Sequence, residues 1–449
     1  MNGHLLKKLL LAALTCALLT FSGCSLAYGD SLLALPKLPG EYVQLQQELD
    51  DILESGSTYA VAETGANRQT VQLVDLDGDG REEALAFFRT ADGTYQVYAF
   101  RQTDKGFERF DMAEGYGNTL RSISYPKCGP DGQLAIALSW GFDDTIYYGM
   151  TVLRLTANGF ENMLDLSYAG ALIEDFDGNG ADELAFAVRD SVTGLYSARV
   201  YRYQNSEYAQ IIEVGMCLEV KSVASMQYSL LEDGNRALFI DSQSISGGYV
   251  TDVISYDGST AGNETIDPAS GSGSATWRPI SVFSADINGD GALDVPVGRS
   301  GDTEARNRLS WCAFADGVAV ETVGSTYHSP TEAWYLLWPE QWGEAVESVK
   351  TNGNGMTKTT FSVILPPPAD PDEERKEQRS ALLSIWVFTG DNREEHMQLY
   401  PGLHLLRSTV SAIYGYTLVE NDFPAYALTD EQVGALFHTI ETNWQSEVS

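Results

Sequence analysis

Residues 71–88 spell VQLVDLDGDGREEALAFF, in which two apolar segments flank a short turn crowded with carboxylates. Apolar segments bounded by Asp and Gly are typical of two β-strands joined by a tight turn. Asp and Gly are common in any turn, so solvated side chains are one explanation of the acidic residues. The alternative is a loop that binds a hard cation, because carboxylates this close repel one another unless positive charge lies between them.

The same pattern recurs along the chain. Two further copies keep the acids, ALIEDFDGNGADELAFAV at 171–188 and SVFSADINGDGALDVPVG at 281–298. Two weaker copies keep only the turn, PDGQLAIAL at 130–138 and LEDGNRALFI at 231–240. The turn glycines are separated by 52, 48, 54 and 57 residues and are Gly80, Gly132, Gly180, Gly234 and Gly291. A fixed period of this length indicates a repeat architecture.

A second feature follows each copy in the same phase, a strand-like segment that enters a polar turn. These segments are VYAFRQTDKGF, VLRLTANGF, VYRYQNSEY, VISYDG and WCAFADGV. With about four strands, each unit has the size of one propeller blade, and blades must stack to bury their apolar faces. The sequence therefore predicts a mainly β fold, a β-propeller over 57–328 with five legible blades and room for more. STYAVAET at 57–64 is expected to add a closing strand.

The three acidic turns share one spacing. Acidic or amide side chains stand at relative positions 1, 3, 5 and 9, glycine stands at position 6, and position 7 offers its carbonyl. Alternate residues of a tight turn point inward, so these oxygens converge, and all-oxygen ligation suits Ca²⁺. The predicted ligands are Asp75, Asp77, Asp79, Arg81 and Glu83 in the first loop, Asp175, Asp177, Asn179, Ala181 and Glu183 in the second, and Asp286, Asn288, Asp290, Ala292 and Asp294 in the third.

An EF-hand shares these positions but needs a bidentate acid at position 12 and flanking helices. Position 12 is Ala86, Phe186 or Val297, and strands are expected on both sides, so an EF-hand is excluded. The weaker copies show that the turn exists without carboxylates, so the extra acids predict up to three structural Ca²⁺ ions as cofactor. At the matching positions 1, 3 and 9, one weaker copy has Lys127, Gly129 and Ala135, and the other has Ser229, Leu231 and Ala237.

The acidic loops resemble those of FG-GAP and VCBS-type repeats, the calcium-bearing blades of integrin-like propellers. The resemblance rests on the D-x-[DN]-x-[DN]-G-x-x-[DE] spacing between strands, and the FG and GAP sequence tags are absent. It implies blades that calcium holds together. The stretch from FTGDNREE to FHTIETNW is similar to the C-terminal part of uncharacterised surface lipoproteins of Gram-positive bacteria.

The first residues indicate export. Lys7 and Lys8 precede an apolar run that ends in FSGC, so residues 1–24 are expected to be a signal peptide. FSGC resembles a bacterial lipobox with Phe21 in place of the usual Leu. The resemblance implies lipidation of Cys24 and anchoring at the outer face of the cell membrane, and plain secretion is the alternative.

Two smaller pieces flank the propeller. Residues 25–40 are expected to be a tether and 41–56 a helix. Residues 329–449 are expected to form a small α+β domain that ends in a helix with a capping box of Thr429 and Gln432. The expected apolar stripes are Tyr42, Leu45, Leu49 and Ile52 in the first helix, and Val433, Leu436, Phe437, Ile440 and Trp444 in the last.

Three groups of residues outside the acidic loops allow more than one interpretation. Three tryptophans fit a buried core or a sugar-binding platform, with burial favoured. Four histidines are either scattered or a metal or acid–base cluster, although their spacing matches no zinc motif. Three cysteines form no disulfide framework and are expected to be buried free thiols. These residues are Trp334, Trp338 and Trp342; His328, His396, His404 and His438; and Cys128, Cys217 and Cys312.

Composition and missing motifs narrow the function. A formal net charge of −35 argues against nucleic acid and an anionic membrane face as partners. The sequence has no G-x-S-x-G or H-E-x-x-H motif and no Cys/His pairing, so no catalytic residue is predicted. The favoured hypothesis is a lipid-anchored, non-catalytic protein whose calcium-stabilised propeller binds a surface protein or glycan. A polysaccharide hydrolase or lyase and a structural envelope component are the alternatives.

Overall fold

The computed structural model describes residues 40–440 except 130–131, 144, 146, 232–233, 300–306, 354, 366–377 and 421–422. The predicted signal peptide with Cys24 and nearly all of the predicted tether lie outside these residues, as does Trp444. Within the described part of the chain, no helix is long and apolar enough to cross a membrane.

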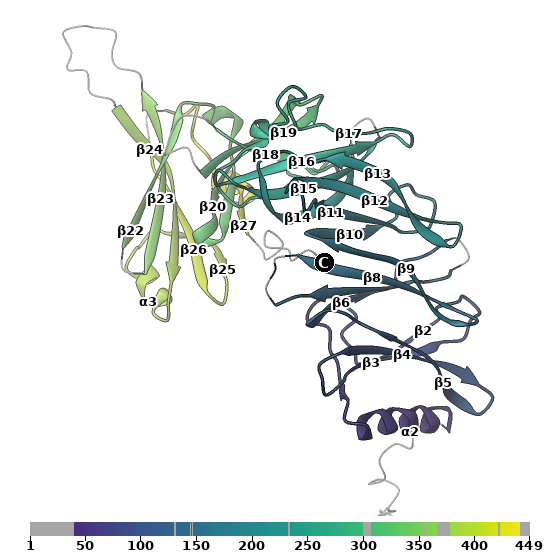
Figure 1. Ribbon diagram of the computed structural model, residues 1–449. Helices are drawn as coiled ribbons and strands as arrows, with labels where there is room; N and C mark the ends of the chain where they lie inside the picture. The colour runs from purple at the N-terminus through teal and green to yellow at the C-terminus, as the bar shows by residue number, and fades with distance from the viewer. Residues whose placement is uncertain are drawn as a thin grey trace, which may run out of the picture.

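Five antiparallel sheets of propeller-blade type succeed one another along the chain (Figure 1), which confirms the predicted mainly β fold with five legible blades. In the second, third and fourth blades each strand pairs with the next strand in sequence. The strands of the first three blades are β1 (Thr58–Tyr59), β2 (Val71–Val74), β3 (Glu83–Arg89), β4 (Tyr95–Thr103) and β5 (Gly106–Glu114); β6 (Thr119–Ser124), β7 (Ile136–Gly141), β8 (Tyr148–Thr156) and β9 (Gly159–Tyr168); and β10 (Gly170–Glu174), β11 (Glu183–Arg189), β12 (Tyr196–Gln204) and β13 (Glu207–Gly215).

The fourth and fifth blades are less regular. The fourth carries the 258–277 segment after its third strand, and the fifth begins with only a short bridge between Ala285 and Asp294. Their strands are β14 (Val220–Leu230), β15 (Arg236–Ser244), β16 (Tyr249–Tyr256) and β17 (Ala261–Asn263), and β18 (Val295–Gly298), β19 (Arg308–Ala315), β20 (Val318–Ser329) and β21 (Trp334–Leu337).

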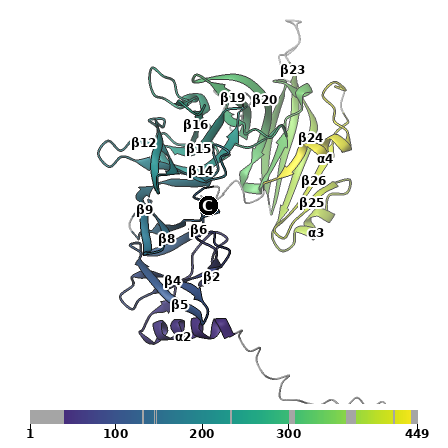
Figure 2. The same ribbon diagram turned by 90° about the vertical axis from the view of Figure 1, so that its right-hand side faces the viewer.

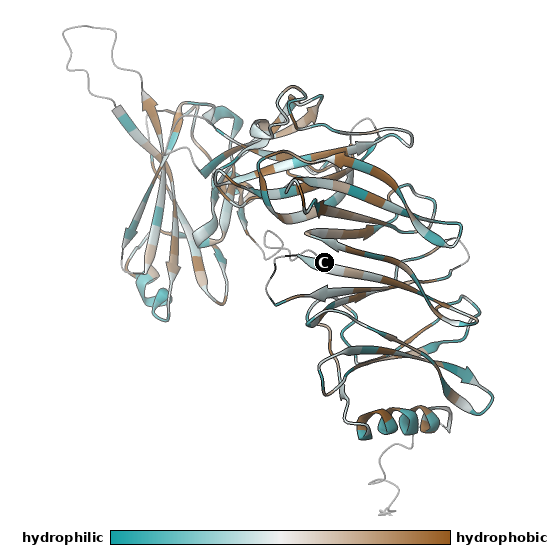
Figure 3. Cartoon of the chain, in the orientation of Figure 1, coloured by the Kyte–Doolittle hydropathy of each residue, from teal (hydrophilic) through white to brown (hydrophobic). Residues whose placement is uncertain are grey.

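Apolar cores lie between successive blades. Phe87 of the first blade packs in one cluster with Trp140 of the second, and Phe186 of the third blade shares a cluster with Val152 of the second. Because the second strand of a blade is covered on both faces, β7 is buried from end to end. Figure 3 shows the apolar residues gathered on the strands and the polar residues at the turns. Stacking therefore buries faces that no blade could bury alone.

The five turn glycines repeat in conformation as well as in spacing. All five have φ between +78° and +90°, a left-handed backbone that side chains with a Cβ adopt only with strain. The weaker copies share this conformation with the acidic copies, so the turn itself does not depend on carboxylates.

Helix α2 (Gly40–Glu54) covers the outer face of the first blade. Leu49 and Ile52 pack with Phe88 of β3, as the apolar stripe of the sequence predicts. Figures 1 and 2 show α2 and the fifth blade at opposite ends of a curved row. The helix therefore covers an apolar face that the last blade would cover in a closed ring. The strand expected at 57–64 is Thr58–Tyr59, but the expectation that it closes the propeller is wrong, because it pairs with β3 of the first blade and not with the fifth blade.

A sixth sheet follows the fifth blade, in the order β22-β23-β24-β26-β25. Strand β21 and the last strand, β27, extend the fifth blade, so strands from both sides of the expected boundary at residue 329 pair in one sheet. The remaining elements are β22 (Val346–Gly353), β23 (Met356–Leu365), β24 (Gln378–Thr389), α3 (Arg393–Gln398), β25 (His404–Ser408), β26 (Ala412–Leu418), α4 (Asp430–Leu436) and β27 (Phe437–Thr439).

The last helix is shorter than predicted. Helix α4 begins with the expected capping box, in which Thr429 Oγ1 accepts a hydrogen bond from the Gln432 N–H at 3.2 Å. Phe437–Thr439 leaves the helix and pairs with β21, so the prediction of a helical stripe through Phe437 and Ile440 is wrong. Pairing with a buried strand overrides the local helical spacing, because helix propensity is a weak preference.

The structure resolves the three ambiguous groups. The tryptophans belong to the core between the fifth and sixth sheets, with Trp334 and Trp342 fully buried, so the sugar-platform interpretation is wrong. His328 is fully buried, and both it and His438 stack on Tyr335. The groups of described residues that are able to hold a metal are acidic and contain no histidine. The three cysteines are buried free thiols, as expected.

Candidate metal centre

The acidic turns lie along one edge of the arc. Each acidic turn lies directly before the second strand of its repeat unit. Because the strands of a blade are antiparallel, the turns between the first and second strands of all blades lie on the same side. Backbone hydrogen bonds connect neighbouring turns there: Leu134 N–H donates to Leu76 O, and Asp182 N–H donates to Lys127 O, each at 2.9 Å. We call this side, formed by residues 75–82, 125–129, 132–135, 175–182, 231, 234–235 and 286–294, the loop edge.

Backbone N–H groups hold the carboxylates of the first loop. The Asp75 carboxylate accepts two N–H groups of the turn, at 2.9 and 3.0 Å, and Asp77 accepts one at 3.2 Å. Glu83, the first residue of β3, is only 4% exposed and accepts the Leu76 N–H at 3.0 Å. The three carboxylates are therefore oriented by the fold of the turn itself.

The second and third loops repeat these contacts. Asp175 and Asp286 at position 1 each accept the N–H of the position-6 glycine at 2.9 Å. Glu183 and Asp294 at position 9 accept the N–H of position 2 at 2.9 and 3.2 Å. One spacing in the sequence thus gives one conformation in three blades.

Two loops bring three carboxylates within reach of a shared ion. In each, one oxygen per residue lies within 4.8 Å of the other two. A donor set made only of carboxylate oxygens fits Ca²⁺, which is bound by oxygen ligands at about 2.3–2.6 Å. The two groups are Asp75, Asp77 and Glu83, and Asp175, Asp177 and Glu183.

Position 5 also accepts a hydrogen bond from the turn. Asp79 lies outside the first group of three carboxylates, and Asp79 and Asn179 each accept the N–H of position 7 at 2.7 Å. In the third loop Asp290 accepts the Ala292 N–H at 2.7 Å and a hydrogen bond from the Asn288 amide, also at 2.7 Å. Arg81, Ala181 and Ala292 are thus the N–H donors of these bonds, and the ligand role of their carbonyls stays a prediction.

Burial raises the pKa of Glu83 and Glu183, because the charged form loses hydration. Hydrogen bonds oppose this shift, from the Leu76 N–H to Glu83 and from Arg202 to Glu183. Neighbouring carboxylates add to the shift, Asp177 in the case of Glu183. A cation in the loop would reverse this effect, since opposite charge favours the ionised carboxylate.

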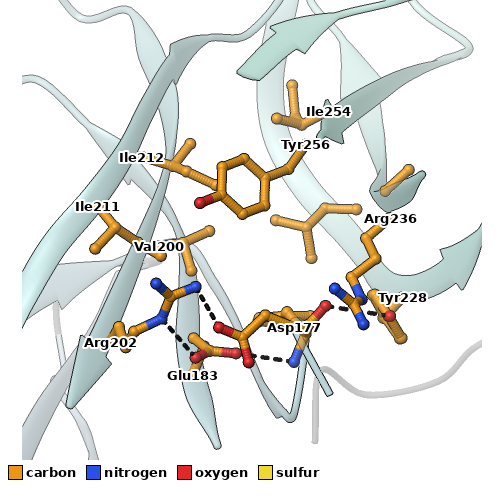
Figure 4. Close-up of a pocket in the computed structure, with 13 residues that line it drawn as sticks. Asp177, Glu183, Val200, Arg202, Ile211, Ile212, Tyr228, Arg236, Ile254 and Tyr256 are labelled. Atoms are coloured by element: carbon orange, nitrogen blue, oxygen red, sulfur yellow. Dashed lines mark hydrogen bonds and ion pairs between the residues drawn. The ribbon is translucent and has the colours of Figure 1, made fainter. Parts of the chain in front are cut away.

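Arg202 of β12 places a positive charge at the second loop (Figure 4). Its Nε lies 3.1 Å from Glu183 Oε1, and its Nη2 forms an ion pair with Asp177. The sequence interpretation missed Arg202. The strand register reveals this contact: Leu184 pairs with Tyr201, so one residue further along the strands Glu183 lies opposite Arg202. Arg202, Asp177 and Glu183 line a pocket between the third and fourth blades, whose apolar walls are formed by Val200, Ile211, Ile212, Leu238 and Ile254.

No family model and no curated protein matches the chain. Solved structures with a partly similar arrangement include the β-propeller domain of the Trilobed protease from Pyrococcus furiosus (11% identity, 71% of this chain and 91% of that chain covered, TM-score 0.26). Sqt1 from Saccharomyces cerevisiae (10%, 82% and 97%, 0.32) and an exo-β-1,3-galactanase from Phanerochaete chrysosporium with galactose (8%, 85% and 91%, 0.27) are further examples. These scores are low, and the description of the fold rests on the sheets of this chain.

Proposed function

We propose that this chain is an exported, non-catalytic binding protein whose propeller blades are stapled by Ca²⁺. The observation that carries the proposal is the recurrence of one acidic turn in three blades with the same hydrogen bonds each time. Its spacing resembles the FG-GAP and VCBS-type repeats, and we infer that the blades are of that type. The signal-like segment and Cys24 support export with lipid anchoring at the outer face of the membrane.

The ion would act on stability rather than on chemistry. The oxygens that would face it are already held by backbone N–H groups, so little rearrangement is needed when it binds. Neighbouring blades share hydrogen bonds at the loop edge, including Leu293 N–H to Ser229 Oγ at 3.1 Å. Neutralising a loop therefore removes charge repulsion at a joint between blades. Sites of this kind outside cells need only modest affinity, with dissociation constants of roughly 10⁻⁴ to 10⁻³ M.

We infer that the partner binds the opposite edge, where the second and third strands of a blade meet and one blade passes to the next. Val192 and Ile245 in these turns are 92% and 67% exposed. Large apolar side chains exposed at the turns of neighbouring blades can form a protein interaction surface. We call this side the connector edge; its exposed large apolar residues are Tyr116, Val192, Leu195, Leu218, Ile245 and Trp277. Aliphatic residues lead among them, which favours a protein partner over a glycan.

The proposal is tested with arrays of surface proteins and glycans, probed with the mature chain in calcium and in EDTA. We expect a protein ligand whose binding is lost in Val192→Asp/Ile245→Asp. The matched control is Val318→Asp, a 59% exposed valine that follows a third-to-fourth turn, on the loop-edge side. A glycan ligand would overturn the choice of partner, and turnover of any polysaccharide would overturn the non-catalytic assignment.

A further inference from the structure

The strand register places an arginine opposite position 9 in three blades. Extending each pairing by one residue sets Arg101 opposite Glu83, Arg154 opposite Ala135 and Arg202 opposite Glu183. In the fifth blade the same step sets Ala313 opposite Asp294. The two loops that gather three carboxylates therefore have an arginine at the same place, and the third acidic loop has none.

The two equivalent arginines make different contacts. Arg202 lies in the second loop, with both Asp177 and Glu183 as ion-pair partners. Arg101 lowers the pKa of Glu83 through its charge but forms no ion pair with the first loop within the described residues: its Nη2 donates to Thr156 O at 2.8 Å, and its guanidinium lies 3.7 Å from the centre of the Phe110 ring. Among the described residues, the carboxylates of these two loops thus form ion pairs with an arginine in the second loop only.

The second loop has a further arginine beside it. Arg236, the first residue of β15 in the fourth blade, lies against the turn, so that a Cβ added at Gly178 would be 2.8 Å from its Nη2. At the matching position beside the first loop the second blade has Leu134. The second loop therefore receives positive charge from its own blade and from the next blade.

We propose that Arg202 is the resident counter-cation of the second loop and competes with a divalent cation for Asp177 and Glu183. The inference rests on the proposed calcium role. An ion that enters this loop must displace the guanidinium from both carboxylates, whereas no arginine forms an ion pair with the carboxylates of the first loop among the described residues. Arg202 is a positioning residue in this scheme, since it holds the loop closed when calcium is scarce.

The proposal predicts an order of affinities. Counting side-chain charges, the first loop has four acids at its ligand positions, the third has three acids and no facing arginine, and the second has three acids opposed by Arg202. Affinity for a hard cation rises with the number of charged ligands. The first loop is therefore expected to fill first, the third next and the second last.

The test isolates the second loop. Asp75→Asn and Asp286→Asn, made together in the mature chain, remove the position-1 ligand of the other two loops. Calcium titration by calorimetry is then compared with and without Arg202→Gln. We expect Arg202→Gln to tighten binding at the remaining site by about tenfold, because a competing ion pair is lost. Arg101→Gln and Arg199→Gln are the controls, the latter on the same strand with an exposed partner, Glu213, and neither should change the affinity.

A second measurement does not depend on the double variant. In the otherwise unchanged chain, Arg202→Gln should lower the melting temperature in EDTA and show a larger rise on addition of calcium than the wild type. Unchanged or weaker calcium binding by Arg202→Gln, in a chain that binds calcium at its other loops, would overturn the inference and leave the proposed function standing. Absence of calcium binding in the wild type and every variant would contradict both.

Discussion

Two parts of the molecule balance the charge of their carboxylates in opposite ways. One is the joint between the fourth and fifth blades, and the other is the acidic loop of the first blade. In the former, Arg278 and Asp241 form an ion pair at 2.6 Å with both side chains fully buried. Thr251 accepts from the Arg278 guanidinium at 2.8 Å, and the Ser284 N–H donates to Asp241 at 3.0 Å. The chain supplies both charges and their hydrogen-bond partners.

The first acidic loop is rich in carboxylates, and its one arginine, Arg81, is exposed to solvent. In the described part of the chain, its carboxylates are oriented by backbone N–H groups and form no ion pair with an arginine, and Asp75 and Asp77 are partly exposed to solvent. The comparison teaches that a buried joint must be neutral from the outset, because an unpaired charge is costly away from water. At the surface, cations from the solvent can neutralise the carboxylates of a joint, so the stability of that joint can depend on the calcium concentration.

The largest expected effect comes from breaking the buried joint. Arg278→Met leaves Asp241 buried without a counter-charge and should lower the free energy of unfolding by about 3–5 kcal/mol. The loss should be equal in calcium and in EDTA, as measured by urea unfolding. Arg199→Gln, which removes an exposed pair with Glu213, should cost at most about 1 kcal/mol. A calcium-dependent loss in Arg278→Met would show that the two kinds of joint are not independent.

Asp252 is expected to show the free-energy cost of ionising a buried carboxylate that has no cation beside it in the described part of the chain. Asp252 is fully buried; its Oδ1 accepts from Cys217 N–H and Asn263, while its Oδ2 has no hydrogen-bond partner among the described residues. Burial raises the pKa of Asp252 to about 6, so the folded state holds a proton that the unfolded state releases at lower pH. The contribution of Asp252 to the free energy of unfolding is therefore complete below about pH 4 and is lost as the pH rises through 6.

Asp252→Asn removes this pH dependence. At pH 8 the variant should be more stable than the wild type by about 2–3 kcal/mol, whereas the two should be similar at pH 4. Urea unfolding across this range measures the difference. A constant difference at all pH values would mean that Asp252 stays ionised throughout.

The acidic loop should lose stability only when calcium is present. Asp77→Asn removes a member of the three-carboxylate group and should abolish about 2 kcal/mol of calcium-dependent stabilisation at saturating ion, with little change in EDTA. Asp79→Asn is the matched control, because Asp79 lies outside that group, and its effect should be smaller. Thermal unfolding with and without calcium measures both. Equal losses with and without the ion would contradict the metal assignment.

The smallest expected effect comes from substitutions at the turn glycines, which test the turn conformation independently of the carboxylate ligands. Gly80 and Gly132 have φ of +85° and +78°, and a Cβ at either would meet no atom within 4 Å. Replacing each with Ala should therefore cost only backbone strain, about 1 kcal/mol in both the acidic and the weaker copy. A much larger loss for Gly80→Ala, confined to calcium, would show that the turn conformation and the ion are coupled.

Local chemistry made part of this protein predictable from its sequence. The five glycines at one period predict five equivalent turns, since glycine adopts positive φ without strain. The spacing of acids predicts which side chains converge, and the structure brings together positions 1, 3 and 9 in two loops. The spacing does not predict the hydrogen bonds within the turn, in which Asp79 accepts the N–H two residues further on, as Asp77 does.

Contacts between distant segments were not predictable. Arg202 meets Glu183 only through the pairing of β11 with β12, and Arg278 meets Asp241 across two blades. Phe437–Thr439 has helical spacing but pairs with β21, a strand about a hundred residues earlier in the sequence. Each of these outcomes depends on which surfaces the completed fold brings together.

By itself the sequence determined the repeat, the strand-and-turn character of each unit and the acidic loops, because these depend on residues a few positions apart. Only the tertiary structure decided that helix α2 covers the first blade and that the blades form an arc ending in a sixth sheet. It also decided which of two equivalent arginines enters an acidic loop. The physical reason is that burial and ion pairing act through space, where partners are chosen by the packing of whole blades and not by their distance along the chain.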